Sequence, residues 1–145
     1  MVITEVRGDL LAAGLPALAH GCNCSGTMGT GVARDIRHRW PPLYRLYRNA
    51  CRAGGFLPGD VLVWPGPPVV YNLAVQLRPG PTASLAAIEV AVARMLQLAE
   101  VGGVAEIGMP RIGCGPGGLR WAEVGPVLDD LAAASEVDLV VFEKP

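Results

Sequence analysis

The hydrophobic residues of this chain alternate between the spacing typical of strands and the spacing typical of helices. Short runs that alternate or are β-branched predict strands at residues 2–6, 15–20, 60–64, 69–74, 104–109 and 137–142. Helical spacing predicts helices at residues 32–40, 43–53, 85–99 and 121–134. Because strands and helices follow one another along the chain, we expect an α/β fold in which helices layer against a mixed sheet.

The ends of the predicted helices carry signals of their own. Ser84 precedes the longest helical pattern and is expected to act as its N-cap. Pro41 and Pro42 are expected to interrupt an earlier helical pattern and so divide it into two helices. The longest helix should bury one face, which is formed by Leu85, Ile88, Val92, Met95, Leu96 and Ala99.

Length and composition limit the class of protein. A chain of 145 residues suits a single domain with a hydrophobic core, and we expect one domain over residues 1–145. With 51% hydrophobic and 17% charged residues, a disordered chain is not expected. The net charge of −1 supplies no global field for a polyanion, so we expect no broad nucleic-acid surface. No apolar run approaches the length of a membrane span.

The four cysteines show no paired spacing that would indicate a disulfide framework. The first residues lack the pattern of a signal peptide, so we expect free thiols and a cytoplasmic protein. His20, Cys22 and Cys24 are spaced too tightly for a zinc knuckle, and no second ligand pair follows them. We therefore expect neither a metal nor a cofactor. Cys114 is interpreted as structural, because a nucleophilic thiolate would need a nearby base.

Two glycine-rich segments each follow a predicted strand. The first runs from Gly21 to Gly31 and the second from Pro110 to Gly118. Glycines leave main-chain N–H groups uncovered, and the N-terminus of a following helix favours an anion. Open α/β sheets bind ligands at the carboxyl ends of their strands, where two such loops can grip a diphosphate from both sides. The chain is therefore predicted to handle a phosphate-bearing small molecule.

These loops do not fit the nucleotide motifs of two large enzyme classes. Neither is followed by Gly-Lys-Ser/Thr, and no acidic cluster is placed to hold magnesium. No GxGxxG fingerprint follows the first predicted strand. Nucleoside triphosphate hydrolysis and hydride transfer are therefore poorly supported.

Three motifs carry a family resemblance: Gly8-Asp9-Leu10, the loop from Asn23 to Gly31, and Pro110-Arg111-Ile112-Gly113-Cys114-Gly115. Together, in this order and over essentially the whole chain, they resemble a macro domain. The resemblance is closest to the branch that contains the terminal ADP-ribose protein glycohydrolase and the DarG antitoxin. It implies a three-layer α/β/α fold with a central mixed sheet and an ADP-ribose cleft above that sheet.

The resemblance also implies roles for single residues. Asp9 would accept a hydrogen bond from the adenine amine, and Leu10 would line the same pocket. Phe142 would lie over the adenine ring. Asn23 would contact the distal ribose. The two loops would supply the remaining ligand contacts, namely Met28, Gly29, Thr30, Gly31, Arg111, Ile112, Gly113, Cys114, Gly115, Pro116 and Gly117.

Simpler explanations are available for several of these residues. A turn or helix cap would account for Asp9, and a turn would account for Asn23. An isolated phenylalanine such as Phe142 belongs to a core more often than to a stacking surface. Arg111 would serve equally well as a ligand contact or as the partner of another side chain. Trp121 is expected to pack beneath the second loop without a catalytic role.

The chain departs from the branch at both catalytic positions. The hydrolases carry a lysine shortly after a Tyr-Asn-Leu strand, and Gln76 occupies that position here. An amide cannot form a Schiff base with the opened ribose, and it does not titrate as an acid or base. One relative carries a catalytic aspartate after Gly-Cys-Gly-x, where this chain has Gly117. The predicted catalytic positions are thus Gln76, Gly117 and the polar Asn23.

Several functions of the cleft are open at this point. One is removal of ADP-ribose from a modified protein or nucleic acid, by substrate distortion and a water activated in the diphosphate cradle. A second is a reader that binds ADP-ribose without chemistry. A third is hydrolysis of a small derivative such as ADP-ribose 1″-phosphate or an O-acetyl ester. An interaction module with a vestigial cleft is disfavoured by the intact Asp9, Phe142 and glycine loops. We predict ADP-ribose binding, favour hydrolysis, and expect an operon-encoded ADP-ribosyltransferase as a candidate partner.

Overall fold

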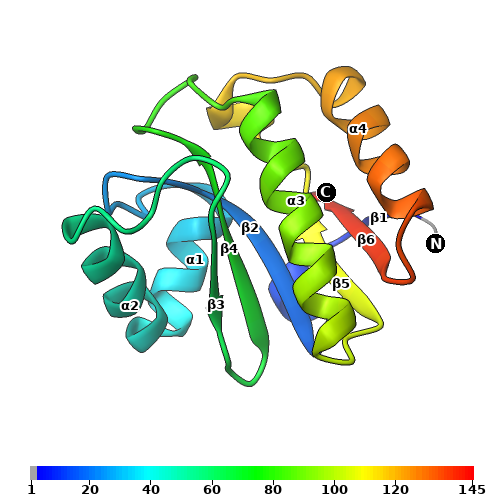
Figure 1. Ribbon diagram of the computed structural model, residues 1–145, viewed down its shortest axis with the longest axis horizontal. Coiled ribbons are helices and arrows are strands. Elements are labelled where there is room, and N and C mark those ends of the chain that lie inside the picture. The colour runs from blue at the N-terminus through cyan, green and yellow to red at the C-terminus, as the bar shows by residue number, and fades with distance from the viewer. Residues whose placement is uncertain (1–2) are drawn as a thin grey trace.

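A computed structural model describes residues 3–145 of the chain. A central six-stranded sheet has the strand order β1-β6-β5-β2-β4-β3 (Figure 1). Neighbouring strands pair in parallel except β3, which runs antiparallel to β4, so the predicted mixed sheet is confirmed. The strands are β1 (Ile3–Arg7), β2 (Ala17–Asn23), β3 (Val61–Trp64), β4 (Val69–Gln76), β5 (Glu106–Pro110) and β6 (Asp138–Glu143).

Helices cover both faces of this sheet. They are α1 (Gly31–Arg39), α2 (Pro41–Arg52), α3 (Leu85–Val101) and α4 (Trp121–Ala133). α3 and α4 pack on one face and α1 and α2 on the other, as Figure 1 shows. The predicted three-layer α/β/α fold is therefore confirmed. Within residues 3–145, no helix has both the length and the hydropathy needed to cross a membrane.

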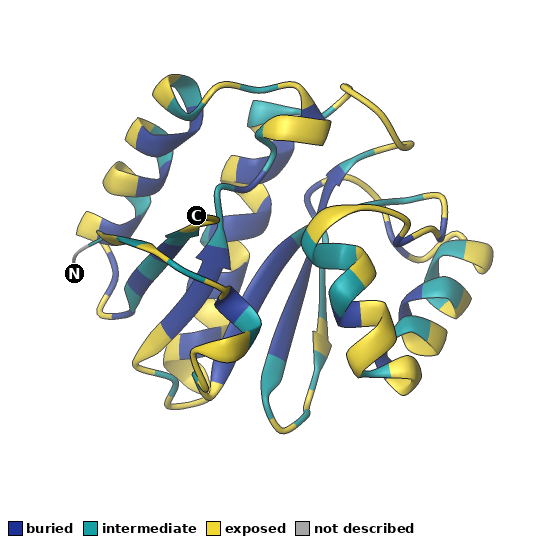
Figure 2. Cartoon of the chain, turned by 180° about the vertical axis from the view of Figure 1, so that it is seen from behind, coloured by how far each residue is buried: buried dark blue, intermediate teal, exposed yellow. Residues whose placement is uncertain are grey.

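The sheet separates two hydrophobic cores. On the α3–α4 side, Ile88 and Leu128 are fully buried in the same cluster as Leu73. On the α1–α2 side, Ile36 belongs to the cluster that contains Val70. Because alternate residues of a strand point to opposite faces, β4 contributes to both cores. Figure 2 shows the result, with buried central strands and helices that are exposed on their outer faces.

The predicted ends of β2 and β4 are wrong. β2 continues through Gly21 to Asn23, so the first loop begins at Cys24. β4 likewise extends to Gln76. The two strands pair with each other over this whole stretch, and Asn23 lies opposite Gln76 after a register shift. A glycine after an apolar run was interpreted as a strand end, but ladder hydrogen bonds to a neighbouring strand keep these residues extended.

The predicted division into two helices at Pro41 and Pro42 is confirmed, but both prolines belong to the second helix instead of lying between the two. Pro41 is the first residue of α2, a position where its missing N–H costs no hydrogen bond and its fixed φ suits the helix. Ser84 is confirmed as the N-cap of α3, since its hydroxyl accepts from the main-chain N of Ala87 at 3.1 Å. The hydrophobic pattern did not predict two short 3-10 helices, η1 (Leu10–Ala12) and η2 (Gly115–Gly117).

Candidate ligand-binding cleft

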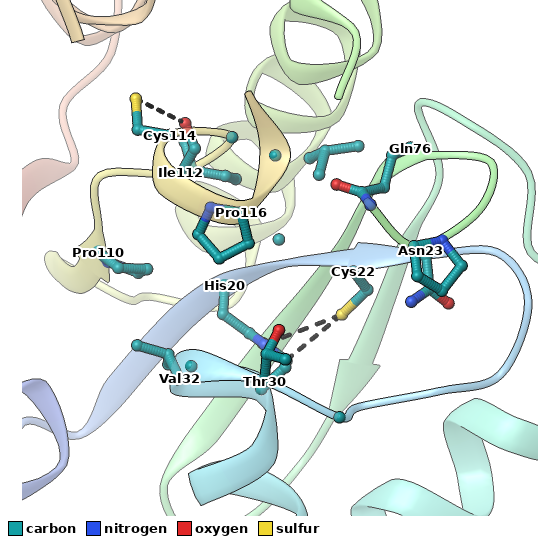
Figure 3. Close-up of a pocket in the computed structure, with 18 of the residues that line it drawn as sticks. His20, Cys22, Asn23, Thr30, Val32, Gln76, Pro110, Ile112, Cys114 and Pro116 are labelled. Carbon is teal, nitrogen blue, oxygen red and sulfur yellow. Dashed lines mark hydrogen bonds between the residues drawn. The ribbon is translucent and has the colours of Figure 1, made fainter. Parts of the chain in front are cut away.

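The two glycine-rich loops lie at the same edge of the sheet, because β2 and β5 are neighbouring parallel strands. The first loop (residues 24–30) connects β2 to α1, and the second (residues 111–118) follows β5 and contains η2. A cavity of about 320 Å³, here called the loop lobe, lies between them. Figure 3 shows Thr30 of the first loop and Pro116 of the second on its two sides. Both loops can therefore contact one ligand.

Most predicted ligand contacts line the loop lobe or a cavity that adjoins it. The loop lobe is lined by Asn23, Gly29, Thr30, Gly31, Gln76, Ile112, Gly113, Pro116 and Gly117. The adjoining cavity of about 360 Å³, here called the Asp9 lobe, is lined by Asp9, Leu10, Gly115 and Phe142. Both lobes share Arg111 and Cys114, together with Val32, Pro110 and Lys144. They form one two-lobed cleft of a size suited to a small-molecule ligand.

Met28 lies apart from the other predicted contacts. Its side chain is only 1% exposed and belongs to the core on the α1–α2 side of the sheet. It is absent from the residues that line the two lobes. The structure therefore assigns Met28 to the core, where its apolar side chain anchors the first loop.

The first turn of α1 opens into the loop lobe. Gly31 and Val32 line this cavity, and the side chain of the preceding Thr30 makes no capping hydrogen bond. The first N–H groups of the helix are therefore left for a ligand, and the helix dipole favours an anion there. Lys144 borders both lobes and adds a positive charge, with its Nζ 3.8 Å from Oδ2 of Asp35. These features suit a diphosphate.

The amide of Asn23 is engaged by its own loop. Its Nδ2 donates to the main-chain O and to the hydroxyl O of Thr27, at 2.9 and 3.0 Å. Its Oδ1 accepts from the main-chain N of Ser25 at 3.0 Å and from the hydroxyl of Tyr47 at 2.7 Å. These contacts support the interpretation of Asn23 as a turn former, and its contact with the distal ribose stays a prediction. Sequence reasoning missed Tyr47, because a tyrosine in a helical apolar pattern does not reveal that its hydroxyl reaches a distant loop.

Gln76 and Gly117 lie next to each other in the lining of the loop lobe. The Nε2 of Gln76 donates to the main-chain O of Arg78 at 2.7 Å and of Gly80 at 3.2 Å, which closes the turn after β4. A Cβ at Gly117 would lie 3.5 Å from Oε1 of Gln76 and 3.0 Å from the Cβ of Ala83. The second loop therefore has no room for an aspartate at position 117 unless its neighbours move. The two expected catalytic positions are brought together, but neither carries a titratable group.

Asp9 and Phe142 each combine a structural contact with a place in the Asp9 lobe. Oδ1 of Asp9 accepts from the main-chain N of Leu11 at 3.0 Å and so caps η1. The exposed carboxylate also lines the cavity. Phe142 is half-buried, packs against the core on the α1–α2 side and lines the same cavity. For both residues the simpler explanation and the ligand-binding prediction are compatible.

Arg111 belongs to a polar network behind the second loop. Its Nη2 lies 3.4 Å from a carboxylate oxygen of Glu5 and 3.4 Å from one of Glu143. Its guanidinium carbon lies 5.2 Å from the centroid of the Trp121 ring, and Nε1 of Trp121 donates to Glu5 at 3.0 Å. These contacts connect the second loop to β1, β6 and α4. They favour the structural interpretation of Arg111, although part of this residue lines the cleft.

The titratable side chains beneath the cleft are neutral at pH 7. Nδ2 of Asn72 donates to the main-chain O of Leu62 at 2.9 Å, so its Oδ1 accepts from Nε2–H of His20 at 2.6 Å. Burial lowers the pKa of His20 from 6.5 to about 4, and the hydrogen bond to Asn72 opposes this only partly. Burial raises the pKa of the Cys22 and Cys114 thiols. Among residues 3–145, no group of three or more His, Cys, Asp or Glu side chains is placed to hold a metal ion.

The fold and the cleft define a class of protein: an α/β/α domain that can hold an anionic ligand between two main-chain loops and a helix N-terminus. Residues 19–128 match the family model of the macro domain. The chain therefore belongs to the macro domain family.

Relatives within this family agree with the predicted branch. The chain is 29% identical to a DNA ADP-ribosyl glycohydrolase of Mycobacterium tuberculosis over 97% of its own length, but it spans only 42% of that relative. The macrodomain of Thermus aquaticus DarG superposes with a TM-score of 0.89 at 29% identity, with 97% of both chains covered. Thermosipho africanus DarTG in complex with ADP-ribose superposes with a TM-score of 0.89 over 99% of this chain and 41% of that chain. At 20% identity, this last similarity shows the fold alone.

Proposed function

We propose that the two-lobed cleft binds ADP-ribose, and that residues 1–145 form one macro domain that removes ADP-ribose from a modified macromolecule. The observation that carries the proposal is the pair of facing main-chain loops with the open first turn of α1 between them. The loop lobe suits the diphosphate and the distal ribose. In the Asp9 lobe, the carboxylate of Asp9 suits the adenine amine and the ring of Phe142 suits the adenine face.

The expected catalytic positions of the loop lobe supply no acid or base at neutral pH, and neither do the two groups His20 and Cys114. His20 is neutral because burial lowers its pKa to about 4, and burial raises the pKa of the Cys114 thiol. Gln76 and Gly117 do not titrate. Removal therefore depends on a water held against the substrate's own diphosphate and on distortion of the bound ribose. The oxygen of this water bonds to the anomeric carbon, the bond to the macromolecule breaks, and the water proton passes to the leaving group.

A release assay with several ADP-ribose linkages tests this function. We expect release from ADP-ribosylated DNA or protein, at a rate that is flat between about pH 6 and 8 because neither Gln76 nor Gly117 titrates. ADP-ribose 1″-phosphate and an O-acetyl ester serve as parallel substrates. Binding of ADP-ribose without release from any substrate would make the domain a reader. That second candidate is favoured by the lack of a titratable group at positions 76 and 117.

Calorimetry with a matched pair of variants tests the binding site itself. Asp9→Asn keeps an acceptor for the main-chain N of Leu11 but loses the second carboxylate oxygen. We expect ADP-ribose affinity to fall about tenfold, the effect of losing one hydrogen bond to a charged group. The control Asp129→Asn removes an exposed carboxylate from α4 and should leave the affinity unchanged. Absence of binding heat from the folded wild-type protein at millimolar ADP-ribose would overturn the proposal.

The proposed chemistry also implies a partner and a place of action. An enzyme that removes ADP-ribose requires a transferase that attaches it, so we infer an ADP-ribosyltransferase encoded in the same operon. Cys22, Cys24, Cys51 and Cys114 are free thiols, which is consistent with action in the reducing cytoplasm. Expression of this chain together with the neighbouring genes would test the first inference, and cell fractionation would test the second.

A further inference from the structure

Positive charge is concentrated on the α1–α2 side of the sheet. Residues 31–52 contain six of the 12 basic residues and one of the 13 acidic residues. Their net charge is therefore +5, against −6 for the rest of the chain. The whole-chain value of −1 conceals this asymmetry, because it sums residues 31–52 with the oppositely charged rest of the chain. The basic residues are Arg34, Arg37, Arg39, Arg45, Arg48 and Arg52.

Five of these arginines form a stripe along the two helices. Arg34 and Arg37 are three residues apart on α1, and Arg45, Arg48 and Arg52 are three or four residues apart on α2, so each set shares one helix face. All of them except the half-buried Arg48 are exposed. In the part of the chain that the structure describes, the only ion pair made by the six arginines joins Arg34 to Asp35 at 3.8 Å. Most of this charge is therefore available to an external anion.

Tyr44 connects the two halves of the stripe to the cleft. The guanidinium carbon of Arg37 lies 4.2 Å from the centroid of the Tyr44 ring, and that of Arg48 lies 5.8 Å from it. The hydroxyl of Tyr44 donates to the main-chain O of Gly26 in the first loop at 2.9 Å. The basic stripe thus continues to the loop that forms one wall of the loop lobe.

We propose that α1 and α2 form a docking surface for the phosphate backbone of a nucleic-acid strand, next to the cleft. Arginines placed around a half-buried aromatic ring are the groups that bind backbone phosphates and stack on bases. The net charge of −6 on the rest of the molecule repels a polyanion there and restricts it to this side. A lipid surface fits less well, since Leu46 is the one exposed large hydrophobic residue of α1 and α2. An unmodified strand should bind, so this inference does not depend on ADP-ribose chemistry.

Two charge-matched double variants test the surface. Arg45→Gln with Arg52→Gln removes two charges from the stripe and touches no residue that lines the cleft. The control, Arg94→Gln with Arg120→Gln, removes two charges from the α3–α4 side. The probe is a fluorescein-labelled oligothymidylate of about 16 nucleotides, which is enough to span one single-strand site. Its anisotropy is measured over a series of KCl concentrations, and circular dichroism verifies that each variant is folded.

We expect binding to weaken as salt is raised, because each phosphate that an arginine neutralises releases counterions. The stripe variant should lower the slope of log K against log salt by about 1.4, which is about 0.7 for each single-strand phosphate that is no longer neutralised. The control variant should leave the slope unchanged. Equal slopes in the wild type and the stripe variant would overturn the proposal. The proposal would also be overturned if poly-L-glutamate displaced the probe as effectively as unlabelled DNA does. That result would indicate an acidic protein partner.

Calorimetry with ADP-ribose on the same variants keeps this test separate from the proposed function. Both double variants should bind ADP-ribose as the wild type does, because neither changes the cleft. Loss of strand binding with intact ADP-ribose binding would support the docking surface. A wild-type protein that binds ADP-ribose but not the strand would overturn the docking surface alone.

Discussion

The two loops of the cleft differ in what fixes them. Side chains dominate in the first, since the amide of Asn23 and the hydroxyl of Tyr47 both bond within it. The first loop has one left-handed glycine, Gly26 with a φ of +89°, whereas the second has three, Gly113, Gly115 and Gly118, with φ values of +75°, +68° and +85°. A side-chain contact is lost when that side chain is changed, whereas a left-handed conformation is strained when its glycine is replaced. Different substitutions should therefore destabilise the two loops.

Gly118→Ala should cause a large loss of stability through the second loop. A Cβ at this position would lie 2.8 Å from the Cβ of Pro81 and 3.1 Å from its Cα, in a rigid ring that cannot rotate away. Left-handed strain and overpacking together should cost about 3 kcal/mol. Urea denaturation measures this cost. Gly115→Ala is the matched control, because it has positive φ but no atom within 4 Å of its Cβ, and should lose only about 1 kcal/mol. Equal losses would show that packing against Pro81 does not matter.

Gln76→Lys tests whether the lack of an amine at position 76 limits the rate of ADP-ribose release. Gln76 pairs with Asn23 in the sheet and faces Gly117 of the second loop. A lysine there would supply an amine able to act on the distal ribose, and we expect release to accelerate about 100-fold. The rate of ADP-ribose release is the measurement. Gln76→Met, which has similar length but no amine, should give no acceleration. An unchanged rate in a lysine variant that still binds ADP-ribose would contradict the alignment of this position.

Acid should destabilise the protein by protonating His20, which lies in β2, the strand before the first loop. His20 has a pKa of about 4 when folded and 6.5 when free, so the unfolded chain binds more protons between these values. The contribution of neutral His20 to the free energy of unfolding is fully present above about pH 6.5. It decreases as the pH is lowered, by about 2 kcal/mol at pH 5. Denaturation with urea across this range provides the test. His20→Gln should flatten this dependence. An unchanged pH dependence in a folded His20→Gln variant would contradict the assignment.

Tyr47→Phe should have a smaller effect, on the first loop. The buried hydroxyl lies 2.7 Å from Oδ1 and 2.8 Å from the main-chain O of Asn23. Its removal takes away one donor to Asn23, whose Oδ1 still accepts from the main-chain N of Ser25, and should cost about 1.5 kcal/mol, together with weaker ADP-ribose binding. Denaturation and calorimetry on one sample give both values. Tyr44→Phe, which removes only a bond to Gly26, should cost less. A larger loss in Tyr44→Phe would show that Asn23 does not organise the loop.

The sequence predicted the architecture better than it predicted the contacts within the site. Helix and strand periods are local properties, so the layers and the Ser84 cap were confirmed, whereas the end of β2 depended on pairing with β4. The glycine loops were also found locally, because their residue types imply main-chain donors. The burial of Met28 was not predicted, since adjacency to Gly29 in sequence does not reveal that its side chain belongs to the core.

The sequence by itself determined the strand and helix order, the two glycine loops, and the lack of a reactive side chain at Gln76 and Gly117. These properties follow from residue types and their local spacing. Only the tertiary structure decided that the amide of Asn23 is consumed by its own loop, and that Gln76 faces Gly117. It also decided that arginines of two helices meet around Tyr44. Such contacts join residues on separate elements, and their geometry is set by how the elements pack against the sheet.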